Sequence, residues 1–455
     1  MGSSTVGEVD DDEYSKLIRK MNPPRVVIDN DACDTATVIR VDSVNKHGTL
    51  LEVVQVIADL NLVITKAYIS SDGSWFMDVF NVIDCDGNKI LDKKIISYIQ
   101  TTLESDECFF PKFRNSVGIV PSSSKDCTSI ELVGPDRPGL LSEICAVLNN
   151  LNCSVVSAEV WTHSNRVAAV VQVTDDPTGL AVEDQARVAV IKNSLCNILK
   201  GSGGNYESHA AKTVVSRGGT HKERRLHQMM FDDRDYARKR FEGGSESSRT
   251  NVAVMDCPEK DYTVVIIRSK DRPKLLFDTV CTLTDMDYVV YHGTVDSGTE
   301  EAYQEYYIRH VDGLPLRSEA ERQRLIQCLE AAIERRTSEG LELEVRTEDR
   351  VGLLSEITRV FRESGLTIRR ANISTRGGEA LDTFYLTENA GNPIDAKTIE
   401  SIRERVGHKI LRIKHNPFSS SSNKPPAALS FAAFLFASFF KGYRFESFRS
   451  IRSYS

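Results

Sequence analysis

One pattern of residues returns four times along the chain, and this repetition limits the fold more than any other feature. Each copy has a short β-like run, an Asp or Asn three positions before a turn residue, a helical pattern and a second apolar run. The four turns are Asn45-Lys-His-Gly48, Asp136-Arg-Pro-Gly139, Asp271-Arg-Pro-Lys274 and Asp349-Arg-Val-Gly352. Internal repetition of this kind indicates several copies of one small domain.

The copies align when positions are counted from the last residue of each turn, taken as position 0. Apolar residues stand at −9 and −7 in every copy, the alternation of a half-buried strand. Positions +2, +5, +8 and +9 form one apolar helix face in three copies, while the third copy has Thr279 and Thr282 in this stretch. Position +13 holds residues that enter left-handed backbone easily, so each helix is expected to end there: Asn61, Asn152, Asp287 and Gly365.

The remainder of each copy completes a known element order. A second strand, a small residue at +19 (Ala67, Ala158, Gly293, Ala371), a third strand, a glycine turn and a second helix follow. Final strands are expected at 409–414 and, more weakly, near 116–120 and 213–216, while the third copy has little chain left for one. The β-α-β-β-α-β order predicts an α+β protein of tandem ferredoxin-like units, with antiparallel sheets and both helices on one face.

These patterns predict six regions of the chain. We expect repeat 1 at 35–120, repeat 2 at 126–200, a linker with a basic segment at 201–256, a divergent repeat 3 at 257–338, repeat 4 at 339–415, and a Ser/Pro-rich and aromatic tail at 416–455.

Composition argues against several classes of function. The formal net charge of −8 disfavours a general nucleic-acid binder. Ten cysteines without C-x-x-C or Cys/His spacing indicate neither a metal site nor a disulfide framework, and favour a reducing compartment, the cytoplasm or nucleus. Gly201-Ser-Gly-Gly204 lacks the ending of a phosphate loop. With no visible nucleophile–base pair, we expect no catalytic residues and no cofactor.

Two segments outside the repeats each allow two interpretations. The basic stretch His221–Phe231 predicts either a short helix with a solvated basic face or a contact with a partner or nucleic acid. The tail run Ala427–Phe440 is apolar, rich in aromatic residues and followed by cations. It is too short to span a membrane, which leaves docking onto the repeats or a partner, or peripheral membrane contact.

The turn between first strand and first helix is the candidate site. Asp136 can cap the helix, Pro138 presets its first turn, and Gly139 leaves the backbone open to an approaching molecule. Unpaired amides and the positive end of the helix dipole favour an anion such as an amino-acid carboxylate. Its ammonium group would then need carbonyls or a side-chain oxygen such as those of Asn61 or Asn152. The alternative is that the motif is only a cap and a tight turn.

The sequences Asp136-Arg-Pro-Gly-Leu-Leu-Ser-Glu-Ile144 and Asp349-Arg-Val-Gly-Leu-Leu-Ser-Glu-Ile357 resemble the start of ACT domains, small regulatory modules that bind amino acids. Four copies resemble the plant ACT-domain-repeat (ACR) proteins. The resemblance implies modules paired side by side, with small ligands at the seam near the turn. The corresponding ligand-binding candidates are Asn45, Gly48, Asn61, Asp136, Gly139, Asn152, Asp349 and Gly352. Lys274 would crowd a carboxylate in the third copy.

We therefore expect a non-catalytic regulatory protein that binds free amino acids at the seams and acts as a sensor for an unknown protein partner. The alternative is an interaction scaffold whose modules no longer bind ligand. The repeats also resemble the sensor end of bacterial uridylyltransferases, but nothing here resembles their catalytic part. The sequence leaves open whether the modules pair within one chain or between two chains of a homo-oligomer.

Overall fold

The computed structural model describes residues 24–45, 47–72, 75–104, 127–200, 212–217, 221–237, 250–257, 259–298, 300–336, 340–388 and 394–415. Four predicted features lie outside these residues: the tail 416–455, the strand near 116–120, the glycine turn at Gly391 and most of the Gly/Ser-rich flanks of the linker.

Two modules, which we call module 1 (25–104) and module 3 (251–334), build the first sheet. Module 1 comprises β1 (Arg25–Asp29), β2 (Thr37–Val44), α2 (Thr49–Asp59), β3 (Val63–Ser70), β4 (Trp75–Ile83) and α3 (Lys93–Glu104). Module 3 comprises β9 (Asn251–Cys257), β10 (Tyr262–Lys270), α7 (Leu275–Asp285), β11 (Tyr288–Asp296), β12 (Glu301–His310) and α8 (Glu319–Glu334).

Module 2 (128–217) and module 4 (341–415) build the second sheet. Module 2 comprises β5 (Thr128–Pro135), α4 (Leu140–Asn150), β6 (Cys153–His163), β7 (Arg166–Asp175), α5 (Gln185–Lys200) and β8 (Lys212–Arg217). Module 4 comprises β13 (Leu341–Glu348), α9 (Leu353–Glu363), β14 (Leu366–Arg376), β15 (Glu379–Glu388), α10 (Ala396–Val406) and β16 (Leu411–His415).

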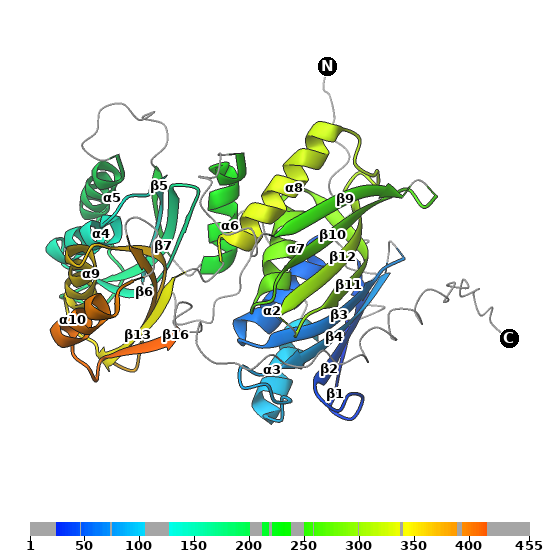
Figure 1. The fold of residues 1–455 in the computed structure, drawn as a ribbon, viewed down its shortest axis with the longest axis horizontal. Coiled ribbons are helices and arrows are strands. Elements are labelled where there is room, and N and C mark those ends of the chain that lie inside the picture. The colour runs from blue at the N-terminus through cyan, green and yellow to red at the C-terminus, as the bar shows by residue number, and fades with distance from the viewer. Residues whose placement is uncertain are drawn as a thin grey trace, which may run out of the picture. The chain divides into compact units, whose positions relative to one another are not determined.

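Within the described part of the chain, each sheet has eight strands and joins modules that are not neighbours in the sequence (Figure 1). The strand orders are β1-β2-β4-β3-β11-β12-β10-β9 and β16-β13-β15-β14-β6-β7-β5-β8. All pairings are antiparallel, and both seams form within one chain. Module 1 therefore pairs with module 3, and module 2 with module 4.

The strand at the outer edge of a module comes from the C-terminal end of the repeat in two modules and from its N-terminal side in the other two. In modules 2 and 4 it follows the second helix, as the sequence predicts, because β8 pairs with β5 and β16 with β13. In modules 1 and 3 it precedes the repeat, because β1 pairs with β2 and β9 with β10. Among the described residues, module 3 thus obtains from the 201–256 range the edge strand that its own C-terminal end lacks. That range also supplies β8, so it is not only a linker.

The two seams have the same register. In both, the small residue at +19 lies opposite the apolar residue at +21 of the other module: Ala67 with Val295, Gly293 with Ile69, Ala158 with Ile373, and Ala371 with Val160. A small side chain opposite a branched one lets the two strands pair without crowding, as in other cross-strand pairs. The repeated small residue of the sequence is therefore a seam residue.

Helices cover one face of each sheet. The +5, +8 and +9 residues of α9 (Ile357, Val360 and Phe361) are buried against the sheet. Burial of such side chains stabilises the fold by about 1.5–3 kcal/mol each. The corresponding first helices pack across the seams, α4 with α9 and α2 with α7, so each core runs continuously through two modules.

The basic segment of the 201–256 range forms α6 (Lys222–Asp232), which lies on the opposite face of the second sheet from α4, α5, α9 and α10 (Figure 1). The apolar contacts of α6 with this outer face are made by Leu226, Met229 and Met230 with Val133, Trp161, Ala168 and Val170. The sequence predicted this helix, but the prediction that its basic face is solvated was wrong. Arg224 keeps only 5% of its side chain exposed and pairs with Asp285 of α7.

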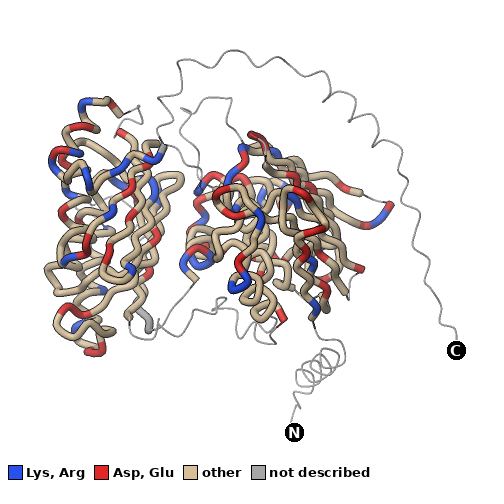
Figure 2. The backbone as a smooth tube through the Cα atoms, turned by 90° about the horizontal axis from the view of Figure 1, so that it is seen from below, with Lys and Arg blue, Asp and Glu red and all other residues tan. Residues whose placement is uncertain are grey.

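Charged residues of both signs are interspersed over the strands and helices of both sheets (Figure 2). None of the described helices is long and apolar enough to cross a membrane.

Candidate ligand site at the module seams

The four turns share a left-handed backbone. The φ angles are +93° at Gly48, +81° at Gly139, +80° at Gly352 and +64° at Lys274. These residues are the N-cap residues of α2, α4, α9 and α7, and none of the four caps its helix with a side chain. Asp136 was expected to cap α4, and this expectation was wrong because Gly139 occupies the capping position. The helix geometry leaves the amides of Leu141 and Ser142 without an intrahelical acceptor.

Side-chain capping is present elsewhere in the same fold. His221 accepts a hydrogen bond from the Arg224 amide at the start of α6, and Ser318 accepts one from the Glu321 amide at the start of α8. The four seam helices have no such cap, and neither does α10, whose N-cap residue is Asp395. An uncapped helix start favours a bound anion.

A residue at +10 of one module lies over the turn of its partner. A Cβ atom added to Gly139 would lie 2.6 Å from Cδ of Arg362 on α9, and one added to Gly352 would lie 3.5 Å from Oδ1 of Asn149 on α4. The two contacts are related by the same pseudo-twofold symmetry as the strands. A Cβ added to Gly48 would meet no atom within 4 Å, so the corners differ in how far they are covered.

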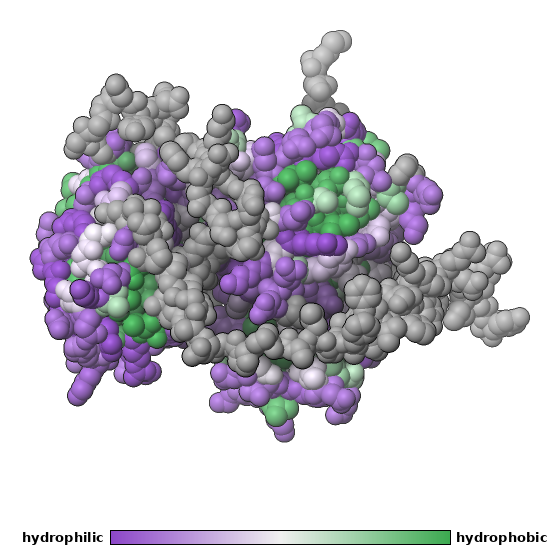
Figure 3. All heavy atoms as spheres, viewed as in Figure 1, coloured by the Kyte–Doolittle hydropathy of each residue, from purple (hydrophilic) through white to green (hydrophobic). Residues whose placement is uncertain are grey.

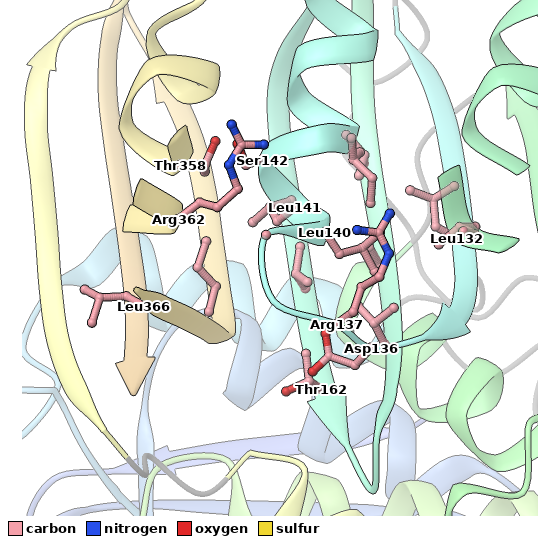
Figure 4. Close-up of a pocket in the computed structure, with 18 residues that line it drawn as sticks. Leu132, Asp136, Arg137, Leu140, Leu141, Ser142, Thr162, Thr358, Arg362 and Leu366 are labelled. Atoms are coloured by element: carbon pink, nitrogen blue, oxygen red, sulfur yellow. The ribbon is translucent and has the colours of Figure 1, made fainter. Parts of the chain in front are cut away.

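The Gly139 corner contains a small cavity of about 20 Å³, which we call the seam cavity (Figure 4). Its lining includes polar side chains from both modules: Asp136, Ser142 and Thr162 from module 2, and Thr358 and Arg362 from module 4. Asp136 and Thr162 lie together at one end of it (Figure 4). In its present form the cavity holds about one water molecule.

Burial raises the pKa of Asp136 to about 6, although Arg369 and Arg137 partly oppose the shift. The carboxyl group thus sits where its charged form lacks full solvation. Arg137 does not compensate it closely, because its guanidinium donates a 2.8 Å hydrogen bond to Glu143 of α4. A bound ammonium group beside Asp136 would supply the missing counter-charge.

Module 3 has a corresponding cavity, also about 20 Å³, at the equivalent place in the first sheet. It contains Lys274 in place of the glycine and Ala58 in place of Arg362. Lys274 donates hydrogen bonds of 2.8 and 3.0 Å to the carboxylate of Glu223 on α6. The cation at this corner therefore has an anionic partner from the chain itself.

The other predicted site residues take separate positions. Asn45 donates to Ser71 Oγ at 2.7 Å, and Asp349 Oδ2 accepts from Thr375 Oγ1 at 2.8 Å. Asn61 and Asn152 adopt φ angles of +55° and +53° just after the helix ends, as predicted. Each lies one eleven-residue helix, roughly 16 Å, from the turn of its own module.

Asn61 and Asn152 are therefore too far from the turn of their own module to bind the ammonium group of a ligand there. The residues that the structure brings to the turns are Arg362 and Asn149, which sequence reasoning missed. The only signal for them was position +10, which differs in every copy: Ala58, Asn149, Thr284 and Arg362.

A network of buried hydrogen bonds and ion pairs joins α6 and the following turn to module 3. His227 forms a hydrogen bond with Asp278 of α7 at 2.7 Å, and Asp235 forms an ion pair with Arg335, just after α8, at 2.6 Å. His163 of β6 forms a hydrogen bond with Asp235 at 2.9 Å. Burial lowers the pKa of His227 more than Asp278 raises it. This network ties both sheets to one segment of chain.

Comparison with known proteins assigns the family. A model of the ACR family N-terminal ACT domain matches residues 32–110, and a model of the ACT domain matches residues 128–189 and 342–407. These ranges fall on modules 1, 2 and 4. The antiparallel sheets with helices on one face are those of ACT domains, which confirms the predicted fold.

Similarity to whole proteins extends over nearly the full chain. The chain is 59% identical to ACT domain-containing protein ACR4 of Arabidopsis thaliana over 98% of each chain, and 63% identical to ACR6 of the same plant over 89% of this chain and 92% of that one. A bifunctional uridylyltransferase/uridylyl-removing enzyme of Rhodospirillum rubrum is 22% identical over 50% of this chain and 22% of its own length. The chain therefore belongs to the ACR family of regulatory ACT-domain proteins.

Proposed function

We propose that this protein is a non-catalytic sensor that binds a free amino acid at the module seams. The observation that carries the proposal is the Gly139 corner. There an uncapped helix start, a half-closed cavity and groups of both charges, Asp136 and Arg362, meet at the seam of two modules.

The chemistry of the corner matches a zwitterion. The ligand carboxylate would accept hydrogen bonds from the first-turn amides of α4 and from the Arg362 guanidinium, which is a strong donor to carboxylates. The ammonium would lie beside Asp136 and Thr162 at the other end of the cavity. The side chain of the bound amino acid would contact the apolar wall of the cavity, which includes Val160 and Ile368.

Ligand entry requires the seam to change. The seam cavity holds about one water, so an amino acid fits only when Arg362 swings away from Gly139 or α9 shifts relative to α4. A ligand that binds the opened seam better than the closed one shifts the equilibrium between them. A protein partner that distinguishes the two states would then respond to amino-acid supply.

A thermal-shift screen of the purified full chain against the twenty amino acids tests the proposal. At least one should raise the melting temperature through preferential binding to the folded state. Gly139→Asp should abolish the shift, because the added side chain enters the space of Arg362 and brings a like charge to the carboxylate. The matched control is Gly87→Asp, which places the same residue at φ +85° with no atom near its Cβ. A flat response of the unmodified protein to every amino acid contradicts the proposal.

A scaffold role is the second candidate, and the tight seams favour it. The Arg362 side chain covers Gly139, and the Lys274 ammonium is already hydrogen-bonded to the Glu223 carboxylate. A scaffold would retain partner proteins equally with and without amino acids. Pull-down with the immobilised full chain separates the two roles, because a sensor changes its partners' retention when the active amino acid is added.

We propose that the protein acts in the cytoplasm or the nucleus. Nine cysteines among the described residues are free thiols, and Cys127, Cys145, Cys153, Cys281 and Cys328 are buried. Unpaired, buried thiols suit a reducing compartment.

A further inference from the structure

A larger cavity lies away from the seams, between α6 and the outer face of the second sheet. Its volume is about 220 Å³, on the order of ten water molecules, compared with about 20 Å³ for the seam cavity. We call it the strap cavity. It exists because α6 packs over β6 and β7 through Leu226 and Met230, leaving the neighbouring strands β5 and β8 less closely covered.

One face of α6 and two strands line the strap cavity. Arg225, Met229 and Asp232 stand at i, i+4 and i+7 on the helix, the spacing of a single helical face. The strands contribute alternate residues of their outer faces: Glu131 and Val133 from β5, and Lys212 and Val214 from β8. The walls are therefore partly apolar, with charged groups of both signs between them.

Two of the charged pairs are already satisfied within the protein. Arg225 forms two hydrogen bonds with Glu131, at 2.7 and 2.8 Å, and this partner raises the pKa of Arg225 further. Asp233 forms two with Arg166, at 2.6 and 2.7 Å. Glu131 and Arg166 are 8% and 2% exposed, so these pairs fix the floor of the cavity.

One cation and one anion remain available at the rim. Lys212 and Asp232 are exposed and form no ion pair with any other residue that the structure describes, although the charge of Asp232 adds to the raised pKa of Arg225. They come from opposite walls, one from β8 and one from α6. A small molecule spanning the cavity would meet a positive group on one side and a negative group on the other.

We propose that the strap cavity is a second binding site, separate from the seams, for a small zwitterion of the α-amino-acid class. The carboxylate pairs with Lys212, the ammonium with Asp232, and an aliphatic side chain lies on Val133, Val214 and Met229. Because α6 also contacts module 3, a ligand in this site would contact the helix that joins the two sheets. The site rests on its own residues and does not require that the seams bind ligand.

Methionine-methyl NMR of the full chain tests the site directly. Met229 lines the strap cavity, whereas no methionine lines the seam cavity. The protein is labelled with [methyl-13C]methionine, the Met229 signal is assigned by its loss in Met229→Leu, and each of the twenty amino acids is titrated. We expect the Met229 signal to shift saturably with at least one, in the unmodified protein and in Gly139→Asp alike.

Variants and analogues then test the chemistry. Asp232→Asn and Lys212→Gln should each weaken binding about tenfold, since each removes a charged hydrogen-bond partner. The methyl ester and the N-acetyl derivative of the active amino acid each lose one charge and should bind about tenfold more weakly. Trp161 fluorescence, which reports on the docking of α6, should stay unchanged in both variants.

The outcomes separate this site from the seam proposal. A Met229 signal that moves in Gly139→Asp supports the strap cavity even if the thermal shift assigned to the seam is absent. The inference is overturned if the signal stays fixed at 50 mM of every amino acid. It is also overturned if both Asp232→Asn and Lys212→Gln bind the amino acid as tightly as the unmodified protein does. A thermal shift abolished by Gly139→Asp, together with a fixed Met229 signal, leaves the seam proposal standing and removes this one.

Discussion

Asp235 provides the sharpest test of how the two sheets are joined. It is fully buried in the turn after α6 and bonds Arg335 beyond α8 of module 3 and His163 on β6 of module 2. Burial alone would raise the pKa of Asp235, but Arg335 and His163 hold it at about 2, below its ordinary value of 3.8. Replacement by Asn keeps the shape and removes the charge.

The expected loss of stability can be obtained from the pKa shift and from the typical cost of an unpaired buried charge. The pKa difference corresponds to about 2–3 kcal/mol of stability at neutral pH. Removing one member of a buried ion pair typically costs about 3–5 kcal/mol, because the remaining charge stays buried. We therefore expect Asp235→Asn to destabilise the docking of α6 and module 3 by about 2–5 kcal/mol.

The assay is urea unfolding followed by Trp161 fluorescence in a Trp75→Phe background. The Trp161 ring lies beneath α6, with its centroid 4.9 Å from that of His227, so its emission reports whether α6 is docked. Asp312→Asn is the control, since Asp312 is an exposed carboxylate. A loss below about 1 kcal/mol in Asp235→Asn would refute the reasoning, because a buried, doubly paired carboxylate cannot be replaced so cheaply.

The pH dependence follows from the sign of the shift. A carboxyl group whose folded pKa is depressed contributes its stability above the unfolded pKa and loses it as the pH falls through the folded value. The difference between the unmodified protein and Asp235→Asn should shrink between about pH 4 and pH 2 and be complete from about pH 4 to about pH 6. Above about pH 6 it should fall in part as His163 loses its proton, because the bond to Asp235 raises the pKa of His163 despite its burial.

Three further predictions follow. Gly293→Val should destabilise the first sheet by about 1–3 kcal/mol in urea unfolding, because even a Cβ there would lie 3.0 Å from Tyr306 and 3.1 Å from Ile69. Thr294→Val, which places the same residue at the next, exposed position of β11, serves as the control. In Asp136→Asn the amino-acid-induced thermal shift should become small and independent of pH, whereas in the unmodified protein it should fall below about pH 6 as Asp136 gains a proton. A thiol reagent should modify exposed Cys85 in the native protein, while Cys145, whose pKa burial raises to about 12, should react only after unfolding, and mass mapping of the labelled peptides distinguishes them.

The sequence predicts the parts of the fold that repeat locally. Strand alternation, helix faces and the left-handed residues Asn61 and Asn152 depend on neighbours within a few positions, so their patterns can be read in one copy and checked in the others. The pairing of module 1 with module 3 depends on contacts between distant segments. The small residue at +19 was visible, but its position opposite +21 of another module was not.

The edge strands β1 and β9 and the burial of α6 escaped prediction for related reasons. An edge strand has one neighbour, so either end of a repeat can supply it, and β9 carries no signal that links it to β10 rather than to the preceding linker. The charges of α6 suggested solvent exposure. Its partners Asp278, Asp285 and Glu131 lie on elements far away in the sequence, and only the folded structure brings them to its faces.

The alternating pairing of the modules has a consequence for biosynthesis. When a ribosome has completed residue 250, modules 1 and 2 have emerged, yet β3 and β6 each lack the strand that pairs with them in the finished sheet, β11 and β14. Unpaired strand edges promote aggregation, so the nascent N-terminal half needs protection until the second half has been made. A gene cut between the two halves would yield two fragments that dissolve poorly alone and regain both sheets only when expressed together.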